Sequence, residues 1–331
     1  MDWLRPRHVA RVCFILWVML VTLHASGVLH HLEGAQQSTQ SAPPALSLGQ
    51  AVVLGIVEGL TEYLPVSSTG HLLLAERVMK IGAPPSASEE EKQRTKEASD
   101  AYTICIQAGA IIAVLGLYLR RVKQMVLGLF GKDPAGLRMV LNVAAGFLPA
   151  AVIGLLFNRV IKEYLFGPWP VVVAWLVGGL AILGVDWWRQ RRGTQRGIVK
   201  QLEDLAWPGA FIIGVAQCLA MWPGTSRSLV TIVGGLIVGL SLPAAVEFSF
   251  LLGMVTLGAA TTYDALKHGS VMLQTFDPLS LVVGLVFAFI AAVLSVKWMV
   301  GYLNRHGLAI FGYYRVALAL VVAPLILMQF F

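Results

Sequence analysis

Two short polar strings interrupt apolar stretches of this chain, and they carry residue types that can do chemistry. Residues 58–71 read Glu-Gly-Leu-Thr-Glu-Tyr-Leu-Pro-Val-Ser-Ser-Thr-Gly-His, and residues 217–231 read Gln-Cys-Leu-Ala-Met-Trp-Pro-Gly-Thr-Ser-Arg-Ser-Leu-Val-Thr. A charged side chain at the centre of a bilayer costs roughly 2.5–3.5 kcal/mol, so charged residues in such surroundings indicate a functional role. The strings therefore predict a hydrated functional site in apolar surroundings.

The first string offers a pair of carboxylates. Glu58 and Glu62 stand four residues apart, which places both on one face of a helix. Paired carboxylate oxygens suit a hard divalent cation such as Mg²⁺ or Ca²⁺, and one of them can instead serve as a general base. A helix-capping or ion-pair role without chemistry is the structural alternative.

Hydroxyls and an imidazole follow the carboxylates. Pro65 is expected to end the first helix, and Ser67, Ser68 and Thr69 to cap the next one. His71 then lies one turn along that second helix, where it can accept a hydroxyl proton or attack phosphorus itself. A lone histidine in a membrane protein is often structural, but these neighbours favour a catalytic role.

The second string supplies a cation. After Pro223, Thr225 and Ser226 can cap a helix that runs on through Thr231. Two helix N-termini then point into one cavity, and their free N–H groups favour an anion. Arg227 can bind two phosphate oxygens at once, so a phosphate or diphosphate is the favoured ligand. A snorkelling or structural arginine is the alternative.

The composition places both strings in a membrane protein. Hydrophobic residues make up 57% of the 331 residues, charged residues only 13%, and the mean hydropathy is +0.73, which excludes an ordinary soluble domain. The net charge of +7 does not indicate nucleic-acid binding, because the cations cluster between apolar spans as topology signals do. We therefore expect no nucleic-acid partner.

Six apolar segments are each near the roughly 20 residues that a membrane-crossing helix needs. They cover residues 101–119, 139–160, 169–188, 244–263, 278–303 and 308–328. Two further stretches, 48–79 and 207–240, are too long for one helix and are interrupted at Pro65 and Pro223. These breaks predict re-entrant helical hairpins, and two spans kinked at proline are the alternative.

The order of these elements repeats. Each half of the chain has one interrupted hairpin followed by three spans, which predicts an all-α membrane protein with an inverted-topology repeat. A chance match of two serine-rich strings is the alternative. Repeat one is expected at about 46–190 and repeat two at about 205–331, together forming one membrane-embedded domain, 46–331. Residues 1–45 are expected to form an extra hydrophobic helix, either a signal peptide or an anchor, and a linker.

Basic residues indicate the topology. They cluster in residues 120–138 and 189–200, which the positive-inside rule places in the cytoplasm. The polar segments 83–97 and 264–277 are then expected as external loops, with the C-terminus also outside.

The joint pattern resembles a known family. Glu58-x-x-x-Glu62 leading into Leu64-Pro-Val-Ser-Ser-Thr-Gly-His71, together with Pro223-Gly-Thr-Ser-Arg-Ser-x-x-Thr231, is similar to the two signatures of bacterial undecaprenyl-diphosphate phosphatases, the bacitracin-resistance type. The resemblance covers about residues 46–331. It implies a bacterial inner-membrane enzyme that hydrolyses the C55 isoprenyl diphosphate to the monophosphate carrier of peptidoglycan synthesis, with the site facing the external side.

The resemblance also implies roles for single residues. It implies that Glu58 and Glu62 bind a divalent metal or assist proton transfer, and that Ser68 or His71 is the nucleophile; a water activated by His71 stays open. The substrate-binding set that it implies consists of hydroxyls and the arginine: Ser67, Thr69, Ser226, Arg227, Ser228 and Thr231.

Other functions stay open at this point. Broken helices in inverted repeats are a transport architecture, so a transporter or flippase for a prenyl-phosphate lipid is the main alternative. A lipid phosphatase with a paired-histidine mechanism is disfavoured, because no histidine follows Arg227 until His268. A homodimer is a further alternative to a monomer.

Overall fold

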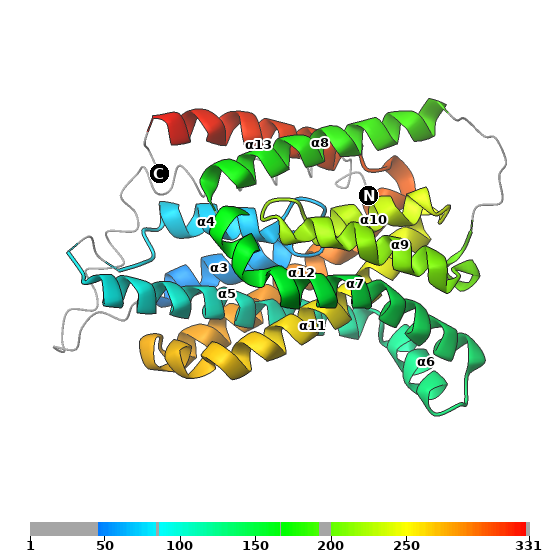
Figure 1. Ribbon diagram of the computed structural model, residues 1–331, viewed down its shortest axis with the longest axis horizontal. Coiled ribbons are helices and arrows are strands. Elements are labelled where there is room, and N and C mark those ends of the chain that lie inside the picture. The colour runs from blue at the N-terminus through cyan, green and yellow to red at the C-terminus, as the bar shows by residue number, and fades with distance from the viewer. Residues whose placement is uncertain (1–45, 84–85, 166, 192–199, 329–331) are drawn as a thin grey trace, which may run out of the picture. The chain divides into compact units, whose positions relative to one another are not determined.

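The computed structural model describes residues 46–83, 86–165, 167–191 and 200–328, and its ribbon is built of helices (Figure 1). These residues belong to one unit of the chain, Pro44–Phe331. The predicted N-terminal hydrophobic helix, residues 1–45, lies outside the described residues.

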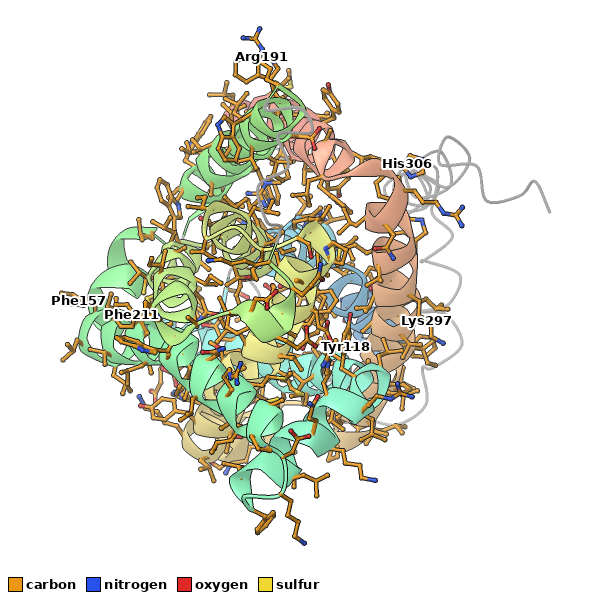
Figure 2. All side chains as sticks on the ribbon, turned by 90° about the vertical axis from the view of Figure 1, so that its right-hand side faces the viewer. Tyr118, Phe157, Arg191, Phe211, Lys297 and His306 are labelled. Carbon is orange, nitrogen blue, oxygen red and sulfur yellow. The ribbon has the colours of Figure 1, made fainter. Side chains whose placement is uncertain are left out.

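Six helices of the described chain are long and apolar enough to cross a membrane. They are α5 (Glu89–Leu117), α7 (Pro134–Leu165), α8 (Pro168–Arg191), α11 (Leu242–Thr275), α12 (Pro278–His306) and α13 (Ala309–Leu327). Phe157 and Phe211 lie on the outer flank of the helices (Figure 2), where they are 50% and 42% exposed. The predicted helical membrane protein with six spans is confirmed.

Two segments that were expected as external loops are largely helical. Helix α5 already begins at Glu89, because Ser88 and Glu91 form a capping box and the first turn is acidic. Helix α11 continues to Thr275, through most of the predicted 264–277 loop. Polar sequence was a poor guide here, since helices can extend beyond the apolar part of a span.

The predicted cytoplasmic segment 120–138 also contains a helix, α6 (Leu119–Leu129). Its Arg121 contacts Glu203, in the short 3-10 helix η2 (Leu202–Asp204), at 2.9 Å and Glu247 on α11 at 2.7 Å. These ion pairs connect α6 to η2 and α11.

Both long apolar stretches are broken where the prolines predicted. The first forms α3 (Leu48–Thr61) and α4 (Ser68–Val78), hereafter hairpin one. The second, hairpin two, forms α9 (Trp207–Gln217), a 3-10 turn η3 (Cys218–Met221) and α10 (Arg227–Ile237). All four α-helices are shorter than a membrane span needs.

The two hairpins share an unusual backbone feature. Helix α4 follows Ser67, whose φ is 76°, and helix α10 follows Ser226, whose φ is 72°. Side chains other than glycine rarely adopt this left-handed region, so both tips hold a serine in a costly conformation. Each helix is also followed by a positive φ, at Lys80 (52°) and at Gly239 (93°).

Close helix packing holds the first carboxylate helix in place. Helix α12 lies along α3, and a Cβ on Gly55 or Gly59 would collide with the α12 backbone at Gly284 or Ala288. The Ser295 hydroxyl on α12 donates to the Gly59 carbonyl at 2.9 Å. The turn of α3 that carries Glu58 is therefore fixed by backbone-to-backbone contact.

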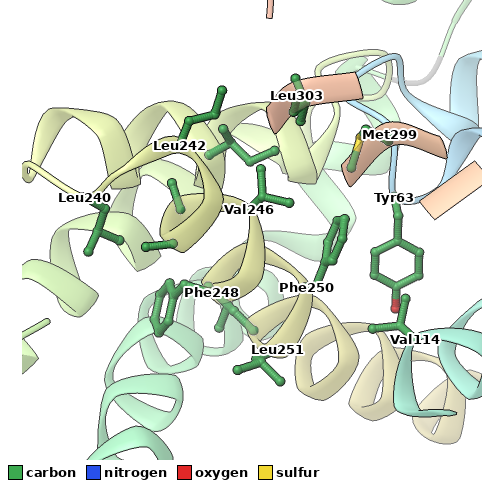
Figure 3. Packing of buried hydrophobic residues seen from close by; sticks show 14 of the residues in the cluster. Tyr63, Val114, Leu240, Leu242, Val246, Phe248, Phe250, Leu251, Met299 and Leu303 are labelled. Atoms are coloured by element: carbon green, nitrogen blue, oxygen red, sulfur yellow. The ribbon is translucent and has the colours of Figure 1, made fainter. Parts of the chain in front are cut away.

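A hydrophobic core supports the tip of hairpin one (Figure 3). The Tyr63 ring meets the Phe250 ring of α11 edge to face, with centroids 5.2 Å apart, and Val114 of α5 lies beside it. Phe250 also packs edge to face on Tyr118, at 5.7 Å. This cluster joins α5 and α11 to the tip next to Glu62.

Candidate active site

The two polar strings meet, as predicted. The Arg227 guanidinium forms an ion pair with the Glu62 carboxylate, with Nη2 and Oε1 3.6 Å apart. The tips also share hydrogen bonds, because the Ser228 and Ser226 hydroxyls donate to the Leu64 carbonyl at 2.9 and 3.4 Å. Two segments far apart in the sequence therefore form one buried site.

Glu62 is the centre of this site. Its Oε2 accepts a hydrogen bond from the Ser68 hydroxyl at 2.5 Å and another from the Gln107 amide at 3.2 Å. A carboxylate only accepts hydrogen bonds when ionised, so Glu62 is placed to take the Ser68 proton. Gln107 on α5 was not singled out from the sequence, although it is a polar residue inside a predicted span.

Glu58 is fully buried, yet neither of its carboxylate oxygens has a hydrogen-bond partner among the described residues. Buried polar groups are normally paired, so an unpaired carboxylate indicates a ligand. Glu58 and Glu62 together supply hard oxygen donors, which fit Mg²⁺ or Ca²⁺. The described residues hold no group of three or more candidate metal ligands, so substrate or water oxygens would have to complete the coordination.

The Arg227 side chain is held in place by residues next to the site. Its Nη1 donates to the Ser249 carbonyl at 2.9 Å, and its guanidinium lies 5.3 Å from the centre of the Tyr63 ring. Behind it, the Thr231 hydroxyl bonds the Arg227 carbonyl at 2.8 Å and the Ser249 hydroxyl at 2.6 Å. Nε and Nη2 lack hydrogen-bond partners among the described residues, so these donors are available to an anion.

A cavity of about 370 Å³ reaches the site from one side. Its lining includes polar groups of Glu58, Ser68, Thr69 and Gln107 and apolar side chains of α4, α8 and α13. Glu62, His71 and Arg227 are not among the described residues that line it. Ser68 is therefore the predicted nucleophile that a ligand in this cavity can reach.

His71 has a different place from the one that the sequence suggested. Its Nδ1 lies 2.6 Å from the Ser67 carbonyl and its Nε2 lies 2.7 Å from the Tyr314 hydroxyl. Because a carbonyl only accepts, Nδ1 carries the proton and Nε2 is left to pair with Tyr314. Both ring nitrogens are engaged, so His71 braces the tip rather than contacting Ser68.

The predicted capping by the first tip is wrong. Ser67 is the N-cap of α4, but its side chain makes no capping hydrogen bond with a described residue, and the Ser68 hydroxyl turns to Glu62. The serine at each tip has a positive φ, so the backbone conformation does not explain the difference between them. In hairpin two, Ser226 does cap, accepting from the Leu229 N–H at 3.4 Å.

The residue that ties the two tips together was not predicted from the sequence. Arg315 on α13 is fully buried and donates to the Gly224 carbonyl at 2.8 Å and the Pro65 carbonyl at 3.3 Å, one in each tip. It also donates to Ala174 on α8 at 2.8 Å, and α13 runs alongside α8 (Figure 1). An arginine inside the predicted span 308–328 was the signal that could have revealed it.

The fold and the site define a class of protein, a multi-pass helical membrane protein in which a carboxylate pair, a serine and an arginine meet between two broken helices. The chain belongs to the family described as Bacitracin resistance protein BacA, whose profile matches residues 51–321. This membership confirms the resemblance drawn from the two polar strings.

Named relatives agree with this assignment. An undecaprenyl-diphosphatase of Sorangium cellulosum is 47% identical over 273 residues, which are 82% of this chain and 84% of the relative. Undecaprenyl-diphosphatase 2 of Rhodospirillum rubrum is 44% identical and an undecaprenyl-diphosphatase of Nitrosospira multiformis 42%, each over 82% of this chain and 93% of the relative.

Proposed function

We propose that this protein hydrolyses undecaprenyl diphosphate to undecaprenyl phosphate and inorganic phosphate. The names of its relatives and its family support the reaction. The observation that carries the proposal is the position of Glu62, which holds the Ser68 hydroxyl on one side and contacts Arg227 on the other. A base, a nucleophile and a cation are what phosphoryl transfer requires.

The geometry favours Ser68 as the attacking group. Its Oγ attacks the terminal phosphorus while its proton passes to Glu62, and the bond from that phosphorus to the bridging oxygen breaks, releasing undecaprenyl phosphate. Water then attacks the phosphoserine, returns the serine and frees inorganic phosphate, with Glu62 again exchanging the proton. Arg227 offsets the charge on the phosphoryl oxygens, and His71 keeps the tip in place.

We propose Glu58 and Glu62 as the residues that hold a divalent metal, either Mg²⁺ or Ca²⁺. The support is the unpartnered, buried Glu58 carboxylate beside a second acid. Such an ion would supply neutralisation of phosphate charge, and Mg²⁺ is commonly bound by one or two carboxylates together with substrate phosphates.

We also propose that residues 46–331 form one membrane domain of two inverted repeats, each with a re-entrant hairpin. The paired serines with positive φ, Ser67 and Ser226, support the repeat. Aligning these two serines pairs Ser68 with Arg227. An alignment of Pro65 with Pro223 differs from this one by one residue. Both hairpins of the site come from one chain, so a homodimer would carry two complete sites.

For the location, we propose the bacterial inner membrane with the site facing outward. Lys96 belongs to the polar segment 83–97, which the charge pattern places outside, and it lines the cavity together with Arg77 and Asp100. Hydrolysis there returns the lipid carrier to peptidoglycan synthesis. The description of the family links it to bacitracin resistance.

The test is phosphate release from undecaprenyl diphosphate by the purified full-length protein in detergent. We expect turnover by the wild type and its loss in Glu62→Ala and after chelation, with recovery on adding Mg²⁺ or Ca²⁺. Binding of the lipid without any release of phosphate would overturn the hydrolase and favour the transporter.

Arg227→Lys measures the role of the guanidinium. We expect KM to rise and kcat to fall together, by roughly 10-fold or more, because a point charge cannot bind two phosphate oxygens at once. Wild-type values of KM and kcat in this variant would mean that Arg227 does not bind the substrate.

A further inference from the structure

A tryptophan outside both polar strings has an unexplained donor. Trp175 on α8 is 1% exposed, and its indole Nε1 has no hydrogen-bond partner among the described residues. A buried N–H without an acceptor is unusual in a folded protein and calls for a ligand or a water.

This indole lies against the first turn of α4. A Cβ on Gly70 would collide with the indole, and Nε1 would lie 3.0 Å from that Cβ. The Trp175 ring is also 5.5 Å from the His71 ring, and its side chain lines the same cavity as Ser68 and Thr69. The free N–H therefore belongs to a side chain that lines the same cavity as Ser68.

The N-terminus of α4 adds donors to the same place. The helix has 11 residues and its N-cap, Ser67, provides no side-chain acceptor from the described residues for the first-turn N–H groups. Uncapped N–H groups at a helix start favour an anion, and here they adjoin an independent, buried and unpartnered donor. Hairpin two differs, because the Ser226 hydroxyl already accepts the Leu229 N–H.

We propose that Trp175 is a substrate-binding residue whose Nε1–H donates a hydrogen bond to an oxygen of the phosphoryl group that Ser68 attacks. The inference rests on the proposed hydrolysis for the identity of the substrate, and it adds a residue that no motif contains. Trp175 transfers no proton; it fixes the orientation of the phosphoryl group beside the Ser68 Oγ.

The test is Trp175→Phe, which removes the N–H and keeps an aromatic ring. We expect KM for undecaprenyl diphosphate to rise about tenfold, since a hydrogen bond to a charged group is lost. Trp222→Phe is the matched control, because the Trp222 indole donates to the Pro170 carbonyl at 3.0 Å and is not a cavity-lining residue. We expect its KM to stay at the wild-type value.

A wild-type KM in a folded Trp175→Phe variant would overturn the proposal, because a buried water then satisfies the indole. A second measurement does not depend on that variant. In the full-length wild type labelled with ¹⁵N-tryptophan, a methylene-bridged, non-hydrolysable farnesyl diphosphate is expected to move one buried indole N–H resonance downfield. No such shift at saturating probe would also overturn the proposal.

The two proposals fail differently. A wild type that releases no phosphate defeats the hydrolase, whereas the indole shift still reports whether Trp175 binds the diphosphate. A wild type that turns over, with neither a KM effect nor an indole shift, defeats the role of Trp175 alone.

Discussion

The two hairpins share a backbone plan but differ in charge. Helices α4 and α10 each have 11 residues and each follows a serine with positive φ. Aligned on these serines, Glu58 of hairpin one corresponds to Gln217 of hairpin two, and Glu62 corresponds to Met221. Hairpin one supplies the acids, and hairpin two supplies the arginine at the position of Ser68.

We expect this difference to favour the binding of a diphosphate. Acids in both hairpins would place four carboxylates around an anionic ligand, and like charges at short range repel in a medium of low dielectric constant. With neutral Gln217 and Met221 opposite, Arg227 is left to offset the charge of Glu62 and of the ligand. The comparison predicts unequal effects for matched substitutions in the two hairpins.

The largest effect is expected at Glu62. Replacing it by glutamine in Glu62→Gln removes the proton acceptor of Ser68 and should lower kcat about 10³-fold. Met221→Leu, at the corresponding position, should leave kcat near the wild-type value, because the swap conserves volume. Phosphate release in detergent measures kcat of both variants. A large loss of kcat in Met221→Leu would contradict the expected difference between the two hairpins.

Glu58→Gln separates activity from stability. We expect kcat to fall about 100-fold, because a proposed metal ligand is lost. In metal-free buffer, the free energy of unfolding of the same variant should be about 1–2 kcal/mol higher than that of the wild type, because an unpaired buried carboxylate is removed. Activity and thermal unfolding without metal check the two effects.

The reverse substitution provides the control. Gln217 is 2% exposed and its Nε2 lacks a partner among the described residues. Gln217→Glu should destabilise the protein by about 3–5 kcal/mol, because it buries a charge without compensation. Equal stability of Gln217→Glu and the wild type would mean that hairpin two tolerates an acid and that the asymmetry has another cause.

Arg315 tests whether the hairpins must be held together. Arg315→Lys keeps the charge but cannot reach the carbonyls of Pro65, Ala174 and Gly224 at once. A small shift between the tips should lower kcat about tenfold, with little change in KM since Arg315 contacts no ligand group. Arg305→Lys, at the exposed end of α12, is the matched control. A KM effect alone would contradict this positioning role.

The sequence could predict what depends on residue type in apolar surroundings. Glu58, Glu62 and Arg227 stood out because charges are costly there, and Pro65 and Pro223 marked the breaks between helices. Arg315 obeyed the same rule, but no neighbouring motif drew attention to it. The six spans followed from length and hydropathy alone.

Tertiary contacts decide what the sequence could not predict. His71 pairs with Tyr314, 243 residues away, and this contact takes its free nitrogen from Ser68. The capping prediction failed at the first tip because the Ser68 hydroxyl donates to Glu62, across the break between α3 and α4, instead of capping α4. Trp175 reads as an ordinary apolar residue of a span, and only the placement of α8 against Gly70 reveals its free N–H.

The open ends of the hairpins extend the comparison. Glu76 of α4 lies outside the six candidate spans, lines the cavity and accepts a hydrogen bond from the Ser99 hydroxyl at 3.1 Å. Burial raises the pKa of Glu76 to about 7, with Ser99 and Arg77 opposing the shift and Asp100 adding to it. Hairpin two has Gly235 at the corresponding position, which cannot titrate.

The smallest effect is therefore expected from Glu76→Gln, and it depends on pH. The pKa of Glu76 in the folded state lies above the usual 4.5, so ionised Glu76 destabilises the folded state. The resulting loss of stability grows between pH 4.5 and about 7 and is complete above pH 7. The variant should raise Tm by a few degrees at about pH 8 and leave it unchanged at about pH 4. Glu90→Gln, at an exposed position, should change Tm at neither pH. If the Tm of Glu76→Gln equals the wild-type Tm at both pH values, the charge of Glu76 does not affect stability, and the charge difference between the hairpins matters only at their tips.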